Sequence, residues 1–290
     1  MRMKKLTLFL IGLLSIVCVQ AEKFEVNGIY YNTIDGQCVE VTHNNVMLGS
    51  NPPTFVNYEG LTTANLPSEV TYNGVKYNVV SIGNYAFNGC KSLTSITIPN
   101  NVIHLGNAMF QGCINLVSIT LPDSITSIGS SMFADCQSLA SITIPINVTY
   151  IGDGAFYGCS SLTSITIPNS VTAIGRSVFS GCSGLTTIVI PNSVTAIGDY
   201  AFYGCSSLTS IEIPNSVTAI GYSAFEECTK LTAIEIPNSV STIGTDAFYG
   251  IDTIFYVGKA SGLPWGAKRV IRGTVKDGDF VYADSTKSCI

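Results

Sequence analysis

Ile190 to Glu212 reads IPNSVTAIGDYAFYGCSSLTSIE, and this 23-residue unit recurs through most of the chain. Three residue types mark the period without one insertion. The prolines are Pro99, Pro122, Pro145, Pro168, Pro191, Pro214 and Pro237, the cysteines are Cys90, Cys113, Cys136, Cys159, Cys182, Cys205 and Cys228, and the phenylalanines are Phe87, Phe110, Phe133, Phe156, Phe179, Phe202, Phe225 and Phe248. A fixed period of this length indicates a solenoid, in which each coil buries its apolar side against its neighbours.

The coil that begins at Leu162 illustrates the expected local structure. Ile165 and Ile167 follow Leu162 with period-two spacing, which predicts a short strand whose apolar side chains point inward. Pro168 ends this strand because proline has no N–H to donate to a neighbouring strand. Residues 176–182 predict one helical or 3₁₀ turn before the next coil. The unit therefore indicates an α/β solenoid of about eight coils over residues 79–254.

A small polar residue stands two positions after each proline. Such a side chain is expected to hydrogen-bond to turn backbone in the neighbouring coil, since buried amide groups need partners. A polar binding stripe is the alternative for this column. Its members are Asn101, Ser124, Asn147, Ser170, Ser193, Ser216 and Ser239.

The pattern LxxIxIPxSVTxIGxxAFxGC resembles the BspA-like leucine-rich repeats of bacterial surface proteins. It departs from the commoner leucine-rich unit, which has LxxLxLxxN and a longer helix. The resemblance implies a right-handed, strand-rich solenoid with short helical turns and a parallel sheet on one face. It also implies a surface-displayed binder rather than an enzyme, with no catalytic residues and no cofactor to carry over.

The two ends of the chain do not follow the repeat. Residues 1–21 predict a secretion signal, with Cys18 as a less favoured lipidation site, and no later stretch reaches the roughly 20 apolar residues of a membrane span. Residues 22–78 predict a hairpin-containing N-terminal cap, or alternatively an independent ligand-binding module. Residues 255–290 predict a C-terminal cap, with Trp265 as an apolar plug at the end of the solenoid.

Composition restricts the partners. The net charge of −5 becomes −8 when the three basic residues of the predicted signal are removed, which disfavours nucleic acid and anionic membrane. The chain has only two histidines, His43 and His104, so a Ser-His-Asp or Cys-His arrangement is not expected. We therefore expect no metal and no cofactor.

The cysteine column is expected to be buried and unpaired. It occupies an inward position in every coil, and free cysteine is among the most buried residue types. Cys38 and Cys289 fall in opposite caps and cannot reach each other. Replacing Cys159 with serine is expected to cost about 1–3 kcal/mol, as for an unsatisfied buried hydroxyl.

The outward positions of the strands carry hydroxyls and few charges, and they are the predicted binding surface. Threonine is also a good strand residue, which would explain much of this pattern without function. Alternatives are the turn tyrosines Tyr157, Tyr203 and Tyr249, or a weak cation site or retaining-glycosidase pair at Glu212 and Glu235. The predicted binding residues are Thr94, Ser95, Thr97, Thr120, Thr143, Thr163, Ser164, Thr166, Thr209, Ser210, Glu212, Thr232 and Glu235.

The sequence thus predicts a secreted or cell-surface protein that functions in binding or adhesion. Its expected partner is an extracellular protein or glycan, of host origin among others, and we expect the protein to be a monomer. A structural spacer of the cell envelope without a specific ligand is the second hypothesis, and a surface glycosidase is the third.

Overall fold

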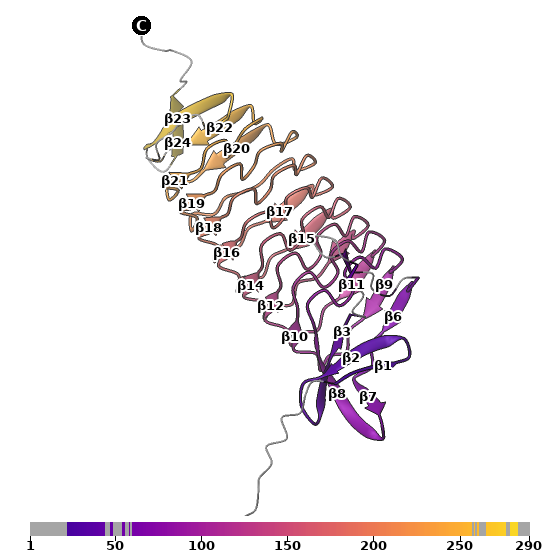
Figure 1. The fold of residues 1–290 in the computed structure, drawn as a ribbon. Helices are drawn as coiled ribbons and strands as arrows, with labels where there is room; N and C mark the ends of the chain where they lie inside the picture. The colour runs from indigo at the N-terminus through magenta and orange to yellow at the C-terminus, as the bar shows by residue number, and fades with distance from the viewer. Residues whose placement is uncertain are drawn as a thin grey trace, which may run out of the picture.

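The computed structural model describes residues 22–43, 47–48, 54–55, 58, 60–256, 258, 260, 265–276 and 279–283. The predicted signal peptide, Cys18 and Cys289 lie outside these residues. Stacked coils form one elongated solenoid, with β1 at one end and β24 at the other (Figure 1). The predicted solenoid architecture is therefore confirmed.

One side of the solenoid is a parallel sheet made of the short strands that precede each proline. Ser118 pairs with Ser95 and with Ser141, so neighbouring strands keep the 23-residue register. Three separate ladders run along this side: β6-β9-β11-β13, β15-β17 and β20-β22-β23-β24. In the last of them, β22 to β24 lie beyond the final repeat proline, and β24 pairs antiparallel with β23. Their strands are β6 (Thr63–Asn65), β9 (Ser95–Thr97), β11 (Ser118–Thr120), β13 (Ser141–Ile142), β15 (Ser164–Thr166), β17 (Thr187–Val189), β20 (Ala233–Ile236), β22 (Thr253–Tyr256), β23 (Arg269–Lys276) and β24 (Asp279–Ala283).

A second parallel ladder follows each proline at the opposite side of the coil. Each strand has only two residues because the following glycine turns the chain sharply. A Cβ added at Gly152 would strike the backbone of Ser130 in the preceding coil, so the coils abut at this corner. The strands are β10 (His104–Leu105), β12 (Ser127–Ile128), β14 (Tyr150–Ile151), β16 (Ala173–Ile174), β18 (Ala196–Ile197), β19 (Ala219–Ile220) and β21 (Thr242–Ile243).

The predicted helical turns, and with them the α/β class, are wrong for the described residues, which contain only strands, turns and loops. In the turn after Gly175, the N–H groups of Ser177, Phe179 and Gly181 bind carbonyls of the next coil at 2.7–2.9 Å. Ser177 and Gly181 have left-handed backbone, with φ of 54° and 74°. A helix keeps its hydrogen bonds within one segment. Here every second amide instead joins two coils.

Phenylalanine forms the centre of the core. Each ring of the column is fully buried and stacks on the next, with ring centroids 5.2–5.7 Å apart from Phe87 to Phe248. Tyr58 continues the stack beyond Phe87 at 5.1 Å. Offset aromatic stacking adds to the stabilisation that burial of apolar area gives each coil.

The cysteine column is unpaired and buried, as predicted, from Cys90 to Cys228. Each thiol from Cys113 onward donates to a phenylalanine carbonyl of the preceding coil; Cys159 Sγ lies 3.1 Å from Phe133 O. A serine at position 159 would therefore find an acceptor in place. The cost of Cys159→Ser is therefore expected at the low end of about 1–3 kcal/mol, because the new hydroxyl would not be unsatisfied.

Most of the small polar column after the prolines behaves as predicted, but Ser239 Oγ is buried without a hydrogen-bond partner in the described part of the chain. Ser124, Ser193 and Ser216 donate to the carbonyls of Val102, Val171 and Val194, each in the preceding coil, at 2.6 Å. The Nδ2 of Asn101 donates to Val79 and Ser68 in the same way. These contacts satisfy turn carbonyls, so the structural role of the column needs no ligand.

At the N-terminal end, an antiparallel sheet joins the first coil. β8 pairs with β7 as a hairpin and then continues as a parallel neighbour of β3 and β10. The parallel ladder starts earlier than the periodicity predicts, because Leu61 to Pro67 keeps the apolar spacing while the β7–β8 hairpin interrupts the period. The strands here are β1 (Lys23–Val26), β2 (Ile29–Thr33), β3 (Cys38–Thr42), β4 (Met47–Leu48), β5 (Thr54–Phe55), β7 (Glu69–Tyr72) and β8 (Val75–Ile82).

At the C-terminal end, a shortened coil closes the stack. Trp265 is buried and packs edge-on against Tyr256, with ring centroids 5.3 Å apart. The carbonyl of Trp265 accepts the N–H of Phe248, the last ring of the phenylalanine stack. The hydroxyl of Tyr256 donates to Val240 O at 3.0 Å. The single tryptophan thus covers apolar surface, in line with its predicted role as a plug.

Candidate binding surface

The strand face is the set of outward side chains on the strands that precede each proline. All thirteen predicted binding residues are exposed, from Thr94, just before β9, to Glu235 in β20. Outward and inward side chains alternate along each strand, which gives two outward positions per coil. The residue just before the strand is the third outward position. Stacked coils repeat these positions about every 4.8 Å, which produces three parallel columns.

The first column of the strand face has a structural role. Thr94 Oγ1 donates to Thr62 O at 2.9 Å, and Thr186 Oγ1 donates to Thr163 O at 3.1 Å. Each bond joins two adjacent coils. Threonine is therefore useful here whether or not a ligand binds, and this column alone gives weak support to a binding role.

The second and third columns differ from the first. Ser95 and Ser164 in the second column and Thr97, Thr120 and Thr166 in the third are exposed. Within the described part of the chain, their hydroxyls make no hydrogen bond to protein groups. Each hydroxyl is both donor and acceptor, so these columns offer unused polar groups to a partner.

The strand face is interrupted near its acidic end. Thr209, Ser210 and Glu212 were expected on a strand, but residues 208–213 form none. Glu212 lies between the exposed Val189 and Glu235, in a column that otherwise carries threonine. Like charges opposite each other disfavour strand pairing at this coil, although the ladder also ends between β13 and β15, where this column carries Thr143 and Thr166.

The glutamate pair lacks the surroundings of a glycosidase site. Glu212 and Glu235 are both exposed on an open face, whereas a glycosidase acid is desolvated in a cleft. Among the described residues, no group of three or more His, Cys, Asp or Glu side chains could hold a metal ion. The strand face is thus an open surface without the cleft that shields a glycosidase acid from water.

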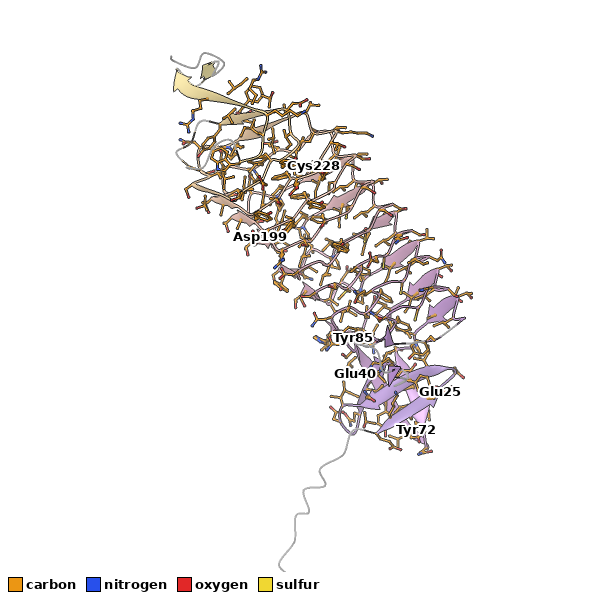
Figure 2. The ribbon with its side chains drawn as sticks, turned by 45° about the horizontal axis from the view of Figure 1, so that its top comes forward. Glu25, Glu40, Tyr72, Tyr85, Asp199 and Cys228 are labelled. Carbon is orange, nitrogen blue, oxygen red and sulfur yellow. The ribbon has the colours of Figure 1, made fainter. Side chains whose placement is uncertain are left out.

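The two histidines lie apart from the strand face. His43 follows β3 and is half-buried, and this burial lowers its pKa below the usual 6.5. His104 is exposed on β10, at the corner ladder. Figure 2 places Cys228 among the inward side chains and Asp199 at the outer edge of a turn. Buried cysteines and exposed acids thus occupy opposite sides of the coil wall.

The turn ridge is the set of exposed side chains between the corner glycine and the cysteine of each coil. Tyr157, Tyr203 and Tyr249 are exposed along it, two coils apart from one another. Tyr200 makes edge-on contacts with Tyr203 and Tyr222, at centroid distances of 6.0 and 5.1 Å. The sequence singled out three of these tyrosines but not the packing of Tyr200 and Tyr222.

Comparison with known proteins agrees with the repeat architecture. The BspA type leucine-rich repeat region matches residues 71–186 and 149–258, in six copies. The chain belongs to the BspA-type leucine-rich repeat family. The match spans more than half of the chain and includes every coil whose phenylalanine lies in the buried stack.

Solved structures give the same result. A leucine-rich repeat protein of Bacteroides ovatus is 33% identical, with a TM-score of 0.64 over 87% of this chain and 71% of that one. A leucine-rich cell surface protein of Faecalibacterium prausnitzii is 27% identical, with a TM-score of 0.63 over 87% and 76%. The leucine-rich repeat protein of T. pallidum is 26% identical, with a TM-score of 0.57 over 79% and 89%.

No curated protein shows significant similarity to this chain. Within the part of the chain that the structure describes, no helix is long and apolar enough to cross a membrane. The repeat match and the similar solved structures thus establish the family and the fold.

Proposed function

We propose that this protein is a secreted or surface-displayed binding protein that contacts an extracellular macromolecule through the strand face. The observation that carries the proposal is the pair of outward columns whose exposed hydroxyls make no hydrogen bond within the described chain. A flat face with many small polar groups suits a broad and shallow contact. Proteins and glycans both present such surfaces.

Location and organisation are part of the same proposal. The predicted signal at residues 1–21 and the surface location printed for the F. prausnitzii relative both favour export. We further propose a right-handed monomer with about eight coils. Its parts are an N-terminal cap at 22–78, repeats at 79–254 and a C-terminal cap at 255–290.

Charge distribution supports a contact role over a purely structural one. An exposed sheet face without function tolerates lysine or glutamate, and such charges increase solubility. The strand face instead keeps serine or threonine at most outward positions and carries carboxylates mainly at Glu212 and Glu235. An envelope spacer without a ligand is the second candidate, because threonine has a high strand propensity whether or not a ligand binds.

A triple substitution tests the proposal. Thr120, Thr143 and Thr166 are exposed and make no side-chain hydrogen bond, so changing all three to lysine should move stability by only about 0.5 kcal/mol per site. Extracellular proteins and glycan arrays are first screened with the parent protein. Affinity of the triple variant for the partner found should fall by at least about tenfold, or ~1.4 kcal/mol.

The matched control lies on the turn ridge. Tyr157, Tyr203 and Tyr249 are replaced together by alanine in an otherwise unchanged chain. If this variant loses the partner while the lysine variant keeps it, the strand face is not the binding surface. If no extracellular partner is captured by the parent protein, the spacer hypothesis is favoured.

A further inference from the structure

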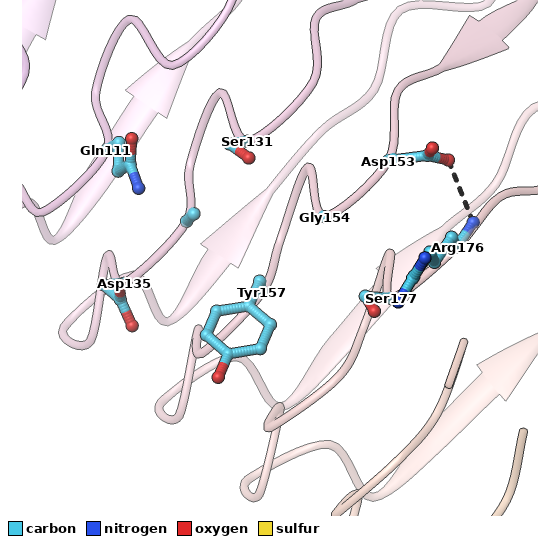
Figure 3. A pocket seen from close by; sticks show the side chains of 9 residues that line it. Gln111, Ser131, Asp135, Asp153, Gly154, Tyr157, Arg176 and Ser177 are labelled. Atoms are coloured by element: carbon cyan, nitrogen blue, oxygen red, sulfur yellow. Dashed lines mark hydrogen bonds between the residues drawn. The ribbon is translucent and has the colours of Figure 1, made fainter. Parts of the chain in front are cut away.

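An open depression lies on the turn ridge, away from the strand face. It has a volume of roughly 310 Å³ and is lined by side chains from four neighbouring turns (Figure 3). The groups that matter are Gln111, Asp135, Tyr157 and Arg176, with the hydroxyls of Ser131 and Ser177 between them. Small-molecule sites occupy volumes of about 300–1,000 Å³.

The depression exists because two columns of the repeat deviate from their usual residues here. Gly154 stands where the neighbouring coils have Ser131 and Ser177, so the floor lacks a side chain. Asp135 stands in a column that otherwise carries glycine in all coils but one, and its carboxylate lies over Gly158. A Cβ added at Gly158 would come within 2.5 Å of Asp135 Oδ1.

The position of Asp135 destabilises the fold locally, through its backbone conformation and through burial of its carboxyl. Its φ of 58° is a left-handed conformation that disfavours side chains, and partial burial raises the pKa of its carboxyl above the usual 3.8. Within the described residues, its carboxylate has no hydrogen-bond donor. Backbone strain and desolvated carboxylates gather at functional sites, so a ligand that donates hydrogen bonds would explain both costs.

The depression continues into an aromatic surface. Arg176 lines the depression, and its guanidinium lies 5.8 Å from the ring centroid of Tyr200. Tyr200 contacts Tyr203 and Tyr222 edge-on and has a left-handed φ of 56°. A bulky residue in this conformation is rare. Contacts therefore run from the depression through Arg176 and the half-buried Tyr200 to the exposed Tyr203 and Tyr222.

Charge decides the class of ligand. Asp135 and Asp153 oppose an anionic ligand, and Asp153 Oδ1 accepts the backbone N–H of Arg176 at 3.0 Å. The Arg176 guanidinium opposes a cationic one. A neutral ligand with many hydroxyls avoids both penalties, since carboxylate, amide and guanidinium groups each hydrogen-bond to hydroxyls. Exposed tyrosine rings add apolar faces on which the flat side of a sugar ring can pack.

We propose that the depression lined by Gln111, Asp135, Tyr157 and Arg176 binds a neutral sugar unit of a glycan, whose chain extends over Tyr200 and Tyr222. The sugar hydroxyls donate to the Asp135 carboxylate and accept from the Gln111 amide and the Arg176 guanidinium. The ring packs on Tyr157. This site is independent of the strand face and of the partner proposed for it.

Asp135→Gly tests the site without threatening the fold. Glycine is the common residue of this column and relieves the left-handed strain, so the variant should be at least as stable as the parent. Neutral oligosaccharides of glucose, mannose, galactose and N-acetylglucosamine are titrated into the full-length protein by calorimetry, beside sialylated and sulfated ones. At least one neutral series should bind, and Asp135→Gly and Tyr157→Ala should each weaken it by about tenfold or more.

Glu227→Gly is the matched control. Glu227 is the other acid in the glycine column, with φ of 62°, but it does not line the depression. This variant should keep the parent's affinity, and so should the strand-face lysine variant. The proposal is overturned if no neutral oligosaccharide binds, if only anionic ones do, or if Asp135→Gly binds as the parent does. Loss of a protein partner alone in Asp135→Gly would mark a protein contact instead.

Discussion

The strand face and the turn ridge belong to the same coils but differ in how uniform they are. On the strand face, Ser95, Ser118 and Ser141 repeat one small side chain in register, and Ser164 keeps the same residue at the 23-residue spacing. On the turn ridge, the position after each phenylalanine runs from Asn88 through Gln111, Ala134, Tyr157, Ser180, Tyr203 and Glu226 to Tyr249. A regular ladder therefore gives a repetitive surface, while the ridge can differ at every coil.

The two surfaces also place different demands on the backbone. Strand-face residues have ordinary extended backbone, so any residue of strand-forming type fits. Each ridge turn contains two left-handed positions, as at Ser177 and Gly181. Asp135 and Glu227 are the non-glycine residues at the second position, and their left-handed backbone makes these two turns locally less stable. A binding site that needs one distinct pocket is more easily built on the ridge than on the face.

Loss of a stacked ring beneath the ridge should have the largest effect. Phe156 is fully buried between Phe133 and Phe179, at 5.5 and 5.7 Å. Phe156→Ala should cost about 3–5 kcal/mol, measured by urea unfolding, because a large cavity is left in a packed stack. Ile165→Val, on the inner side of the strand face, should cost only about 0.5–1.5 kcal/mol. Equal costs would contradict a core centred on phenylalanine.

A glycine of the ridge should tolerate substitution less well than the strand face. Gly181 has φ of 74°, and an added Cβ would lie 3.4 Å from Gly158 Cα. Gly181→Ala should cost about 1–2 kcal/mol, chiefly from left-handed strain. Thr187→Ala, exposed on β17, should stay within about 0.5 kcal/mol in the same unfolding assay. A neutral Gly181→Ala would show that the turn can relax.

The buried thiols should show a moderate effect on mutation. Cys159→Ser should cost about 1 kcal/mol, because Phe133 O is available as an acceptor for the new hydroxyl. Burial raises the pKa of Cys159 to about 12, so the native thiol should resist alkylation at neutral pH. Rapid modification of the native column by a thiol reagent, under conditions where circular dichroism is unchanged, would contradict this packing.

The same thiols predict the alkaline limit of stability. Their pKa values are raised in the folded state above the usual 9.0, to about 12 for Cys159 and Cys228. Between pH 9 and 12 the unfolded chain therefore loses protons that the folded chain keeps. Stability is fully present below pH 9 and should fall as the pH rises through this window. Urea unfolding at a series of alkaline pH values measures the slope.

The smallest expected effect is the difference in stability change between neutralising Asp135 on the turn ridge and neutralising Glu212 on the strand face. The pKa of Asp135 is raised above 3.8 by burial, so its ionised form is disfavoured in the folded state. Asp135→Asn should thus be more stable than the parent at neutral pH, and this gain should vanish well below pH 3.8. Glu212→Gln on the open strand face is the control. An equal gain in stability for Glu212→Gln would contradict the inference that burial in the depression destabilises the Asp135 carboxylate.

Much of the inside of the solenoid could be predicted from the sequence. Phe156, Cys159 and Ile165 recur at one spacing, and inward positions follow from that spacing alone because each coil repeats the same local geometry. The serine column, whose hydroxyls donate to carbonyls of the preceding coil, was predicted on the same basis. The outward positions were also predicted, although residues 208–213 form no strand.

Tertiary structure alone decided the turn ridge. Residues 176–182 carry local signals for a helical turn, but Phe179 N–H binds Ala201 O, a partner 22 residues away that no local propensity reports. The depression likewise needs Gln111, Asp135, Tyr157 and Arg176, which come from four different turns. The sequence by itself determined the period, the buried columns and the strand face, since these are local patterns repeated. Contacts between coils decided the turn conformation and the pocket, because they depend on which irregular residues the stacking brings together.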